Sequence, residues 1–353
     1  MTNVAGERRY DEVYGDTFAL YSRSDMLEFI EPFQIRFERN GLDARKTFAG
    51  KRCLDAACGN GRGALFMLMN GAASVTACDF SPKNVESTQT FLKQFGFGNT
   101  AVAEHTLEKL PYADQSFDFV WCNGVLMHTR HPNKCLHEIT RVLNVGGQSW
   151  IYVYGAGGVY WRTIRLFRKL LEGVGVTECI AALRLLRYET RYVAEFIDDW
   201  FATHLRSYTH ADFGKALTAV GFAPTEPLPY GTPYDTSHRR STFGAREKDL
   251  MGEGDLRYLL TKSRATPASP PQTLDEGEYG SAFDWPSAVT ASLDPLLAKL
   301  AAVCERPWQR IAAAAHIQRE LRLQMTRPEP FDLGEYEQTV ERITHYAASC
   351  AKL

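Results

Sequence analysis

The sequence predicts an α/β protein built on a parallel sheet with helices on both faces. From residue 50 onward, short apolar runs alternate with amphipathic stretches, and this order is typical of successive β-α-β units. A glycine-rich turn joins the first apolar run to the first helical stretch, in "CLDAACGNGRGALF", residues 53–66. With 353 residues, 44% hydrophobic and 23% charged, the chain can form one large domain with additions, or two domains.

Five strands and three connecting helices are expected in this core. Pro82 suits a first helical turn, and Gly96 follows the end of the same helix. The expected strands are Arg52–Ala56, Ser74–Asp79, Asn99–Glu104, Phe117–Asn123 and Gly147–Tyr154, and the expected helices are Gly63–Met69, Pro82–Gln94 and Asn133–Leu143.

After Tyr154 the alternation of strands and helices stops. Residues 159–200 are predicted to form two or three amphipathic helices, which makes them an insertion. Arg184, Arg187 and Arg191 have the i, i+3, i+7 spacing that would place a basic stripe along one of these helices.

The sheet is expected to resume after this insertion. A helix over Ala211–Ala219 would be capped by Thr209 and ended by Gly221, with an extended segment after it. Beyond a Pro-, Ser- and Gly-rich linker at 262–286, helices are expected at Ala288–Met325 and Leu333–Ala351. The predicted units are an N-terminal helical segment (1–48), a core (49–155), a helical insertion (156–206), a return to the sheet (207–247), and a linker with a C-terminal helical appendage (248–353).

The balanced charge favours small partners. The formal net charge is -2, so the chain lacks the basic field that extended nucleic-acid or anionic-membrane surfaces require. The eight cysteines include no Cys-x-x-Cys pair, which predicts free thiols in a reducing compartment and no metal site. No apolar run approaches the ~20 residues of a membrane span. We therefore expect a cytoplasmic protein.

The glycine turn leaves two cofactor classes open. A strand ending at Asp55, then a glycine turn and a helix, presents backbone N–H groups to a nucleotide-like ligand. Gly59-x-Gly61-x-x-Ala64 also satisfies the dinucleotide fingerprint, and Asp79 follows Gly59 by 20 residues, where a ribose-binding acid belongs. The glycines alone do not decide between a dinucleotide and another nucleoside cofactor.

Motifs further along the chain separate these two classes. In order and spacing, "LEKLPYADQSFDFVWCNGVLMH", "HPNKCLHEITRVLNVGG" and "YTHADFGKALTAVGF" resemble class I S-adenosylmethionine-dependent methyltransferases, particularly the small-molecule group allied to the ubiquinone-biosynthesis enzymes. The resemblance covers roughly residues 10–224, with 155–206 loosely matched. It implies a Rossmann-like methyltransferase core that binds S-adenosylmethionine, with the insertion as a helical lid. The alternatives are a nicotinamide-dependent oxidoreductase and a catalytically silent cofactor-binding scaffold.

The resemblance also implies a set of cofactor contacts. Asp55 and the alternating glycines would hold the methionine end, whereas Asp79 would bind the ribose hydroxyls and Phe80 would face the adenine. The family's acid before "LP" is replaced here, so the backbone around Leu107 would hold the adenine, or this segment is an ordinary loop. Gly63 would let the following helix approach the sheet. The implied cofactor-binding set is Tyr14, Asp55, Ala57, Gly59, Gly61, Asp79, Phe80, Thr106, Leu107 and Asn123.

The predicted reaction is methylation of an oxygen or nitrogen of a small molecule. In-line displacement at an activated methyl group depends mainly on alignment and on exclusion of water. A hydroxyl or ammonium acceptor must still lose a proton, and His128 after the fourth strand is the candidate general base; alternatively, it caps or packs in that loop. The expected acceptor-binding set is Tyr10, His128, Tyr230, Tyr234, His238 and Arg239, the last four from the loop "PYGTPYDTSHRR".

Two further expectations concern Tyr10 with Tyr14 and the partners of the chain. The two tyrosines have i, i+4 spacing, and they form either the roof of the site or an ordinary packing pair. The loop "NGVLMH" differs from the Asn/Asp-Pro-Pro-Tyr-like loop that suits flipped bases, so no nucleic-acid partner is expected, and no membrane partner either. The C-terminal helices either stabilise the chain or mediate a homodimer.

Overall fold

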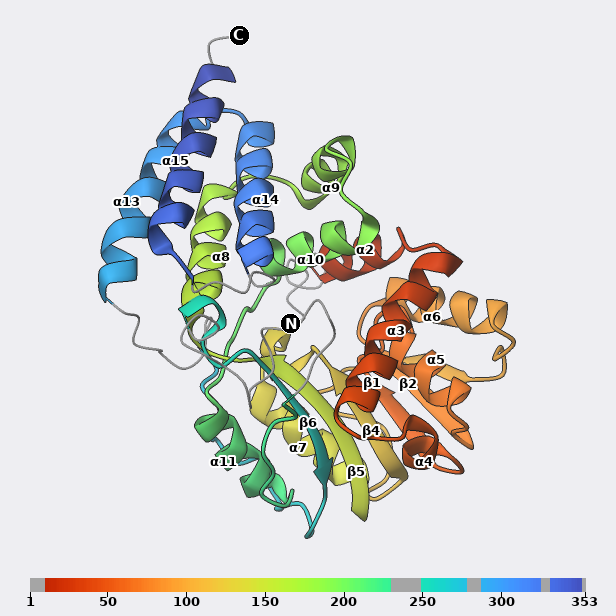
Figure 1. The fold of residues 1–353 in the computed structure, drawn as a ribbon. Coiled ribbons are helices and arrows are strands. Elements are labelled where there is room, and N and C mark those ends of the chain that lie inside the picture. Colours follow the sequence, from red (N-terminus) through yellow and green to blue (C-terminus); the bar gives the residue numbers. More distant parts are fainter. Residues whose placement is uncertain (1–9, 230–248, 278–286, 325–330, 351–353) are drawn as a thin grey trace, which may run out of the picture.

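The computed structural model describes residues 10–229, 249–277, 287–324 and 331–350. An α/β half holds the sheet, and a group of helices lies above one end of the strands (Figure 1). The helices above the sheet come from two separate stretches of sequence, the predicted insertion and the C-terminal appendage (Figure 1). The helical half is therefore assembled from two segments that are far apart in the sequence.

The sheet has six strands in the order β3-β2-β1-β4-β5-β6, parallel except for β6, which is antiparallel to β5. The strand order reverses between β1 and β4, and open α/β sheets bind ligands at the strand carboxyl ends beside such a switch point. The strands are β1 Arg52–Ala56, β2 Ser74–Asp79, β3 Ala101–Glu104, β4 Phe117–Asn123, β5 Leu143–Tyr154 and β6 Asp255–Thr261.

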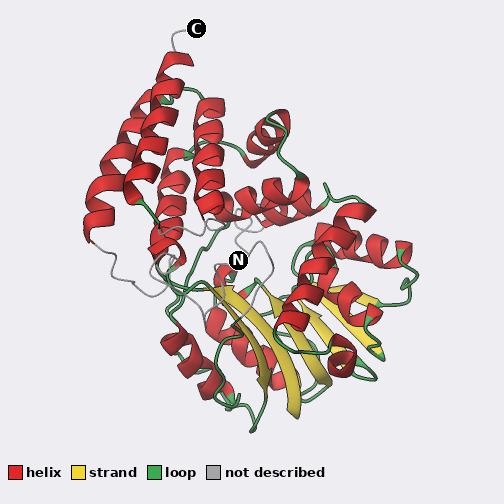
Figure 2. Cartoon of the chain, in the orientation of Figure 1, coloured by secondary structure: helices red, strands yellow, loops and turns green. Residues whose placement is uncertain are grey.

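Helices cover both faces of this sheet, as the sequence predicts (Figure 2). Alternate strand residues divide between two apolar clusters: Phe119 and Trp121 pack with α3 and α5, whereas Val120 and Cys122 pack with α7. The helices of this half are α3 Arg23–Arg39, α4 Ala44–Phe48, α5 Arg62–Met69, α6 Pro82–Gln94, α7 Pro132–Val142 and α11 His210–Val220, preceded by the short turns η1 Asp11–Gly15 and α2 Asp16–Phe18.

Three strands and one helix have the predicted bounds, and the other boundaries differ by a few residues. β5 begins at Leu143, which the sequence assigns to the preceding helix. The predicted caps of α11 are confirmed: the Thr209 hydroxyl accepts a hydrogen bond from the Asp212 N–H at 3.1 Å, and Gly221 has a φ of 118°. Gly63 does bring α5 close to the sheet, since a Cβ there would lie 2.6 Å from the Trp121 ring.

The position of the last strand was not predicted correctly. Within the described part of 207–247, the predicted return to the sheet, Tyr208 and Phe222 form isolated bridges with Gly155 and Lys262, but the sixth strand lies at 255–261. The sequence of this strand, "DLRYLLT", does not indicate a buried strand, because it contains Asp255 and Arg257. In the structure both side chains are buried and form an ion pair with each other. Two charged residues in seven look like a surface segment when their pairing is unknown.

The upper half contains the lid helices and the C-terminal helices. The predicted basic stripe of Arg184, Arg187 and Arg191 is wrong. Helix α9 ends at Leu185 and Arg187 has a φ of 61°, so these arginines do not share one helix face. The predicted helix 288–325 is two helices, separated at 304–306. The elements are α8 Gly158–Leu170, α9 Val176–Leu185, α10 Thr190–Phe201, α13 Ser287–Val303, α14 Pro307–Gln324 and α15 Leu333–Cys350.

Two expectations about the whole chain can be compared with the described residues. The seven cysteines whose side chains are described are buried free thiols, as predicted. Across the described ranges, no helix combines the length and the apolar character needed to cross a bilayer.

Candidate functional site

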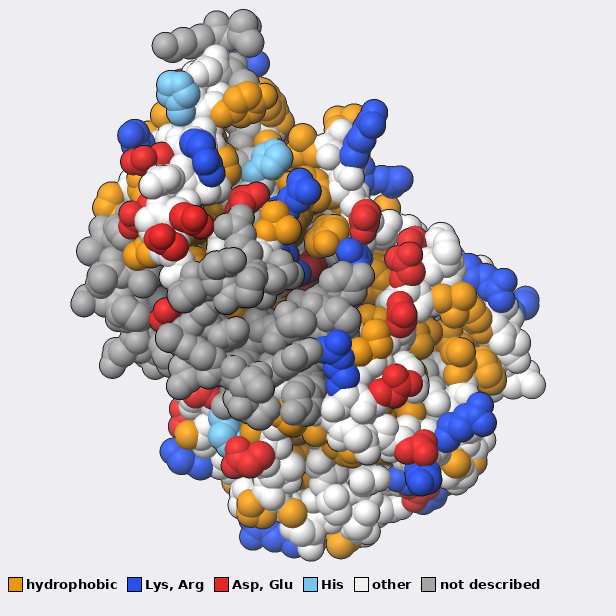
Figure 3. Space-filling view, in the orientation of Figure 1, with side chains coloured by type: hydrophobic (Ala, Val, Ile, Leu, Met, Phe, Trp, Pro, Cys, Tyr) orange, Lys and Arg blue, Asp and Glu red, His pale blue; other side chains and the backbone are white. Residues whose placement is uncertain are grey.

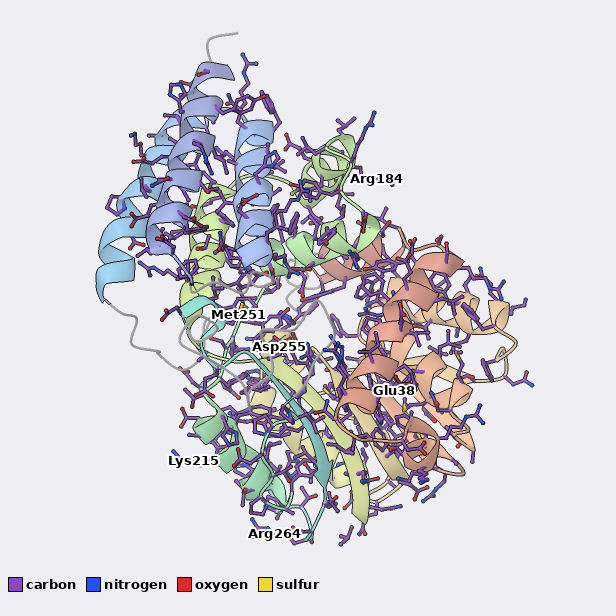
Figure 4. All side chains as sticks on the ribbon, viewed as in Figure 1. Glu38, Arg184, Lys215, Met251, Asp255 and Arg264 are labelled. Atoms are coloured by element: carbon purple, nitrogen blue, oxygen red, sulfur yellow. The ribbon has the colours of Figure 1, made fainter. Side chains whose placement is uncertain are left out.

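A cavity of about 1420 Å³ lies between the sheet half and the helical half (Figure 3). Residues at the carboxyl ends of three strands line one end of it, namely Asp55, Asp79 and Asn123. The opposite end is lined by α10 and by α14, which belong to the lid and to the C-terminal appendage. Figure 4 shows Met251 and Asp255, two further lining residues, between the two halves.

Asp79 is a buried carboxylate at the end of β2. Its Oδ2 accepts the Gly59 N–H at 2.8 Å, and its Oδ1 accepts the Ser81 N–H at 2.9 Å and the Asn84 side-chain N–H at 3.1 Å. Burial raises the pKa of Asp79, and these hydrogen bonds act in the opposite direction. The side chain is therefore held in one orientation beside the glycine turn.

Asp55, at the end of β1, fixes the start of helix α5. Its Oδ2 accepts the Ala64 N–H at 2.6 Å, and burial raises the pKa of Asp55 to about 7. The turn between Asp55 and α5 has left-handed backbone at Gly59 (φ 57°) and Gly61 (φ 83°), a conformation that glycine adopts without steric cost. The turn thus exposes backbone near two carboxylates in one cavity.

Phe80 gives this end of the cavity an aromatic wall. Its side chain is 41% exposed although it lines the cavity, and its ring meets the Tyr10 ring edge-to-face at 6.0 Å. Thr106 and Leu107 also line the cavity. An accessible ring, a buried carboxylate and a left-handed glycine turn together fit the adenine, ribose and amino-acid parts of a nucleoside cofactor.

Asn123 has one of its two side-chain groups already engaged. Its Oδ1 accepts the indole N–H of Trp150 at 2.9 Å. The amide nitrogen and the second lone pair of Oδ1 therefore remain for a ligand in the cavity that Asn123 lines.

His128 is buried, and its two ring nitrogens have different surroundings. Nδ1 lies 2.9 Å from the backbone oxygen of His204, which can only accept, so Nδ1 carries the proton. Nε2 has no hydrogen-bond partner among the described residues, and it lies 3.6 Å from Oδ1 of Asp198. In the neutral imidazole, Nε2 therefore holds a lone pair beside a carboxylate.

Asp198, from lid helix α10, accepts hydrogen bonds from two tyrosine hydroxyls. Tyr14 donates to its Oδ1 at 2.9 Å and Tyr154 donates to its Oδ2 at 3.0 Å. Burial, and then the Asp198 charge, raise the pKa of both tyrosines, so their hydroxyls stay protonated donors. Tyr10 donates its hydroxyl to the backbone oxygen of His128. The N-terminal segment, the loop after β4, the end of β5 and the lid thus meet at one point.

The comparison with known families decides between the cofactor classes. A family model described as "Methyltransferase domain" matches residues 54–151, which hold the glycine turn, Asp79 and Asn123. The chain carries a class I S-adenosylmethionine-dependent methyltransferase domain. S-adenosylmethionine is therefore the cofactor of the domain, as the sequence resemblance implies.

Two relatives and one solved structure illustrate the similarity of this methyltransferase chain to known proteins. A 27-O-demethylrifamycin SV methyltransferase of Amycolatopsis mediterranei is 28% identical over 221 residues, 61% of this chain and 78% of that protein. A tRNA U34 carboxymethyltransferase of Methylococcus capsulatus is 37% identical over 202 residues, 57% of this chain but only 53% of that protein. The YcgJ structure of Bacillus subtilis has 18% identity, covers 63% of this chain and 94% of its own, and has a TM-score of 0.38.

The cavity of the methyltransferase chain brings together most of the residues that the sequence indicates. Gly61 is not among the lining residues, since it caps the start of α5. Tyr230, Tyr234, His238 and Arg239 lie outside the described residues. The predicted residues that line the cavity are Tyr10, Tyr14, Asp55, Ala57, Gly59, Asp79, Phe80, Thr106, Leu107, Asn123 and His128.

Sequence reasoning missed Asp198 and Tyr154. A signal for the first was present, because "FIDDWF" places two acids inside the apolar run of an amphipathic helix, where an unpaired carboxylate is costly. Tyr154 ends a strand and looks like an ordinary core residue in the sequence. The lining residues of α14 carried no signal, since nothing in the sequence places the appendage beside the cavity.

Proposed function

We propose that this chain transfers the methyl group of S-adenosylmethionine to an oxygen or nitrogen atom of a small-molecule acceptor. One observation carries the proposal: a single cavity is lined both by the residues that fit the cofactor and by His128, whose Nε2 has no hydrogen-bond partner among the described residues. A nucleophile in that cavity can lie within reach of both the methyl donor and a base. The relative from Amycolatopsis, named as a rifamycin O-methyltransferase, supports an oxygen of a small molecule.

The cofactor end supplies binding and orientation. Asp79 would bind the ribose, Phe80 would face the adenine, and the turn at Gly59 would hold the methionine end beside Asn123. When bound, S-adenosylmethionine supplies a methyl group that its sulfonium already activates. The chain then has to align the acceptor and exclude water rather than provide strong acid–base chemistry.

His128 would take up the proton of the acceptor, and Asp198 would stabilise the resulting charge. Nε2 of His128 accepts the proton that the acceptor oxygen or nitrogen loses, and the ring becomes a positive imidazolium. The carboxylate of Asp198, 3.6 Å away, then stabilises that charge. Because Nδ1 stays bonded to the His204 carbonyl, the ring does not turn between the two states. Asp198 is thus a positioning and charge-stabilising residue for the base.

The lid would keep water from this part of the site. Asp198 comes from α10, and its two tyrosine partners come from the N-terminal segment and from the end of β5. Lid and core are therefore tied together over His128 by hydrogen bonds whose groups are largely buried. Such a cover over His128 favours a small acceptor over a polymer. The predicted cytoplasmic location remains part of this proposal.

Methylation or a related transfer to tRNA is the second candidate function. The relative from Methylococcus, named as a tRNA U34 carboxymethyltransferase, favours it with 37% identity. The net charge of -2 gives less support, because tRNA binding depends strongly on a basic surface. The two candidates differ in the acceptor and share the cofactor.

Calorimetric titration with S-adenosylhomocysteine, the demethylated product, tests the cofactor end. We expect the native chain to bind at one site. Asp79→Asn should lose affinity by at least about tenfold, since hydrogen bonds to a charged group contribute ~1.5–3 kcal/mol. Glu86→Gln, which changes an exposed carboxylate on α6, is the control and should keep the native affinity. Absence of binding to the native chain would overturn the proposal.

Transfer from S-adenosylmethionine labelled in its methyl group tests the acceptor. The native chain is incubated with a panel of small phenols, aliphatic alcohols and amines, and separately with unmodified tRNA. Label on a small molecule supports the proposal. Label on tRNA alone replaces it with the second candidate.

A further inference from the structure

Helix α14 of the C-terminal appendage is held against the lid by buried polar contacts. The Gln318 side chain donates to Oδ2 of Asp199 at 2.7 Å and to the Tyr160 hydroxyl at 2.9 Å. Its carbonyl oxygen accepts the indole N–H of Trp200 at 2.6 Å. Gln318 is fully buried, so these bonds set the rotation of α14 about its own axis.

This rotation turns one face of α14 toward the cavity. His316, Arg319 and Leu323 have i, i+3, i+7 spacing, and they line the cavity together with Arg322. The segment between α9 and α10 lines the same end, with Leu186, Arg187, Tyr188, Glu189, Arg191 and Tyr192. The appendage is therefore a wall of the cavity as well as a support for the lid.

Most of the charged groups at this end have partners. Four arginines lie there with four acids, Glu189, Glu195, Asp198 and Asp199: Glu195 pairs with Arg322, Glu189 pairs with Arg191 at 3.2 Å, and both aspartates accept tyrosine hydroxyls. Within the part of the chain that the structure describes, no carboxylate forms an ion pair with Arg187 or Arg319. Among the described residues, Arg187 and Arg319, both exposed, are thus the two guanidinium groups at this end that have no carboxylate partner.

The charge of Arg319 acts on two groups of this end. Burial lowers the pKa of His316, on the same helix, and the charge of Arg319 lowers it further. Burial raises the pKa of Tyr188, in segment 186–192, and the charge of Arg319 opposes this rise.

Apolar surface accompanies these charges. Leu186 and Leu323, which both line the cavity, are each 42% exposed, and Tyr188 of the same lining is partly buried. In Figure 3, blue, pale blue and orange side chains gather around the hollow below the upper helices. A surface that combines apolar side chains with guanidinium groups suits a ligand that has an apolar body and a negative group.

We propose that α14 and the segment 186–192 form an outer acceptor subsite that binds the anionic group, a carboxylate or a phosphate, of an acceptor with an apolar body. Arg187, which follows α9, and Arg319 of α14 are the two residues that contact this group. Leu186, Leu323 and Tyr188 contact the body. The role of the subsite in catalysis rests on the proposed function, but binding of the anion does not depend on methyl transfer.

The test compares ligands that differ only in charge. Calorimetric titration of the full chain, with S-adenosylhomocysteine present, uses benzoate and phenyl phosphate as anionic probes and benzamide as the neutral probe. We expect at least one anion to bind about tenfold or more tightly than benzamide, because charge-assisted hydrogen bonds to arginine add to the shared ring contacts. The tighter of the two anions identifies a carboxylate or a phosphate as the preferred group.

The variants Arg187→Gln and Arg319→Gln, alone and together, locate the subsite. The double variant is expected to lose about tenfold in affinity for the anion while benzamide and S-adenosylhomocysteine bind as in the native chain. Arg184→Gln removes the same charge from an exposed position on α9 outside this cavity, and we expect native affinity (Figure 4). Equal binding of anions and benzamide, or an unchanged double variant, would overturn the subsite. Failure of S-adenosylhomocysteine to bind, with anion binding intact, would instead overturn the proposed function alone.

Discussion

The side-chain nitrogen of Gln318 lies 2.7 Å from Oδ2 of Asp199, and this hydrogen bond joins the C-terminal appendage to the lid. The Tyr160 hydroxyl donates to the same oxygen at 2.7 Å. Burial, and then the neighbouring Asp198, raise the pKa of Asp199 to about 8. Folding therefore favours the protonated form of Asp199, whereas Asp198 one residue earlier accepts hydrogen bonds from two tyrosine hydroxyls.

The first prediction concerns pH and the stability of the fold. Unfolded, Asp199 has the ordinary pKa of about 3.9, so between about pH 4 and 8 the folded state binds more protons and the free energy of unfolding falls as pH rises. Asp55, with its pKa raised to about 7, acts with the same sign. We expect urea unfolding to show lower stability at about pH 8 than at about pH 5, with a shallower decline in Asp199→Asn.

The control for this prediction is Glu172→Gln, which changes an exposed carboxylate after α8. Its stability should decline with pH in parallel with that of the native chain. Parallel behaviour of Asp199→Asn would show that Asp199 is not protonated in the folded state.

The second prediction concerns the approach of α5 to the sheet. In Gly63→Ala, the added Cβ would lie 2.6 Å from the Trp121 ring and 2.8 Å from the Asp55 carboxylate, both of which are buried. We expect a loss of about 1–3 kcal/mol in the free energy of unfolding, measured in urea. Gly175→Ala is the matched control, because a Cβ there meets nothing within 4 Å, and it should change stability by no more than about 0.5 kcal/mol. Equal effects of the two substitutions would contradict the close approach.

The third prediction concerns Phe80 as a wall for the adenine. Phe80→Ala removes a ring that is 41% exposed in the cavity, so it should cost little stability but weaken S-adenosylhomocysteine binding roughly tenfold or more, because stacking of a base on an aromatic ring contributes ~1–3 kcal/mol. Leu185→Ala, at an 85% exposed position on α9, is the control and should bind normally in the same titration. Native affinity in Phe80→Ala would remove Phe80 from the cofactor site.

The core of the fold could be predicted because each of its elements has a local signal. Strands such as Ser74–Asp79 are short apolar runs, and α6 begins at a proline and matches its predicted bounds. β6 has no such local signal, because Asp255 and Arg257 interrupt its apolar pattern. These two charges neutralise each other only in the folded state. Local pattern does not show which charged residues will find a partner.

The cofactor end of the site was also predictable, whereas the acceptor end was not. Asp79, Phe80 and Asn123 follow strands of the core, so their place in the sequence fixes their place at the strand ends. Asp198 and Arg319 reach the cavity through the packing of helices that are far apart in the sequence. That packing depends on buried contacts such as Gln318 with Asp199, which no spacing in the sequence reveals.

The last prediction concerns His128 as the base. In His128→Gln, the side chain has no nitrogen that accepts a proton near neutral pH, although it can still hydrogen-bond. With the acceptor found in the labelling experiment, we expect the turnover number to fall about 10²–10⁴-fold, the range for loss of a general base, while S-adenosylhomocysteine affinity stays native. His210→Gln is the control, because His210 lies at the start of α11, is not among the cavity-lining residues and pairs with Glu226 at 2.9 Å, and it should turn over normally. If His128→Gln lowered affinity and turnover together, or only lowered stability, His128 would be a packing residue of its loop, and the proton would have to leave by another route.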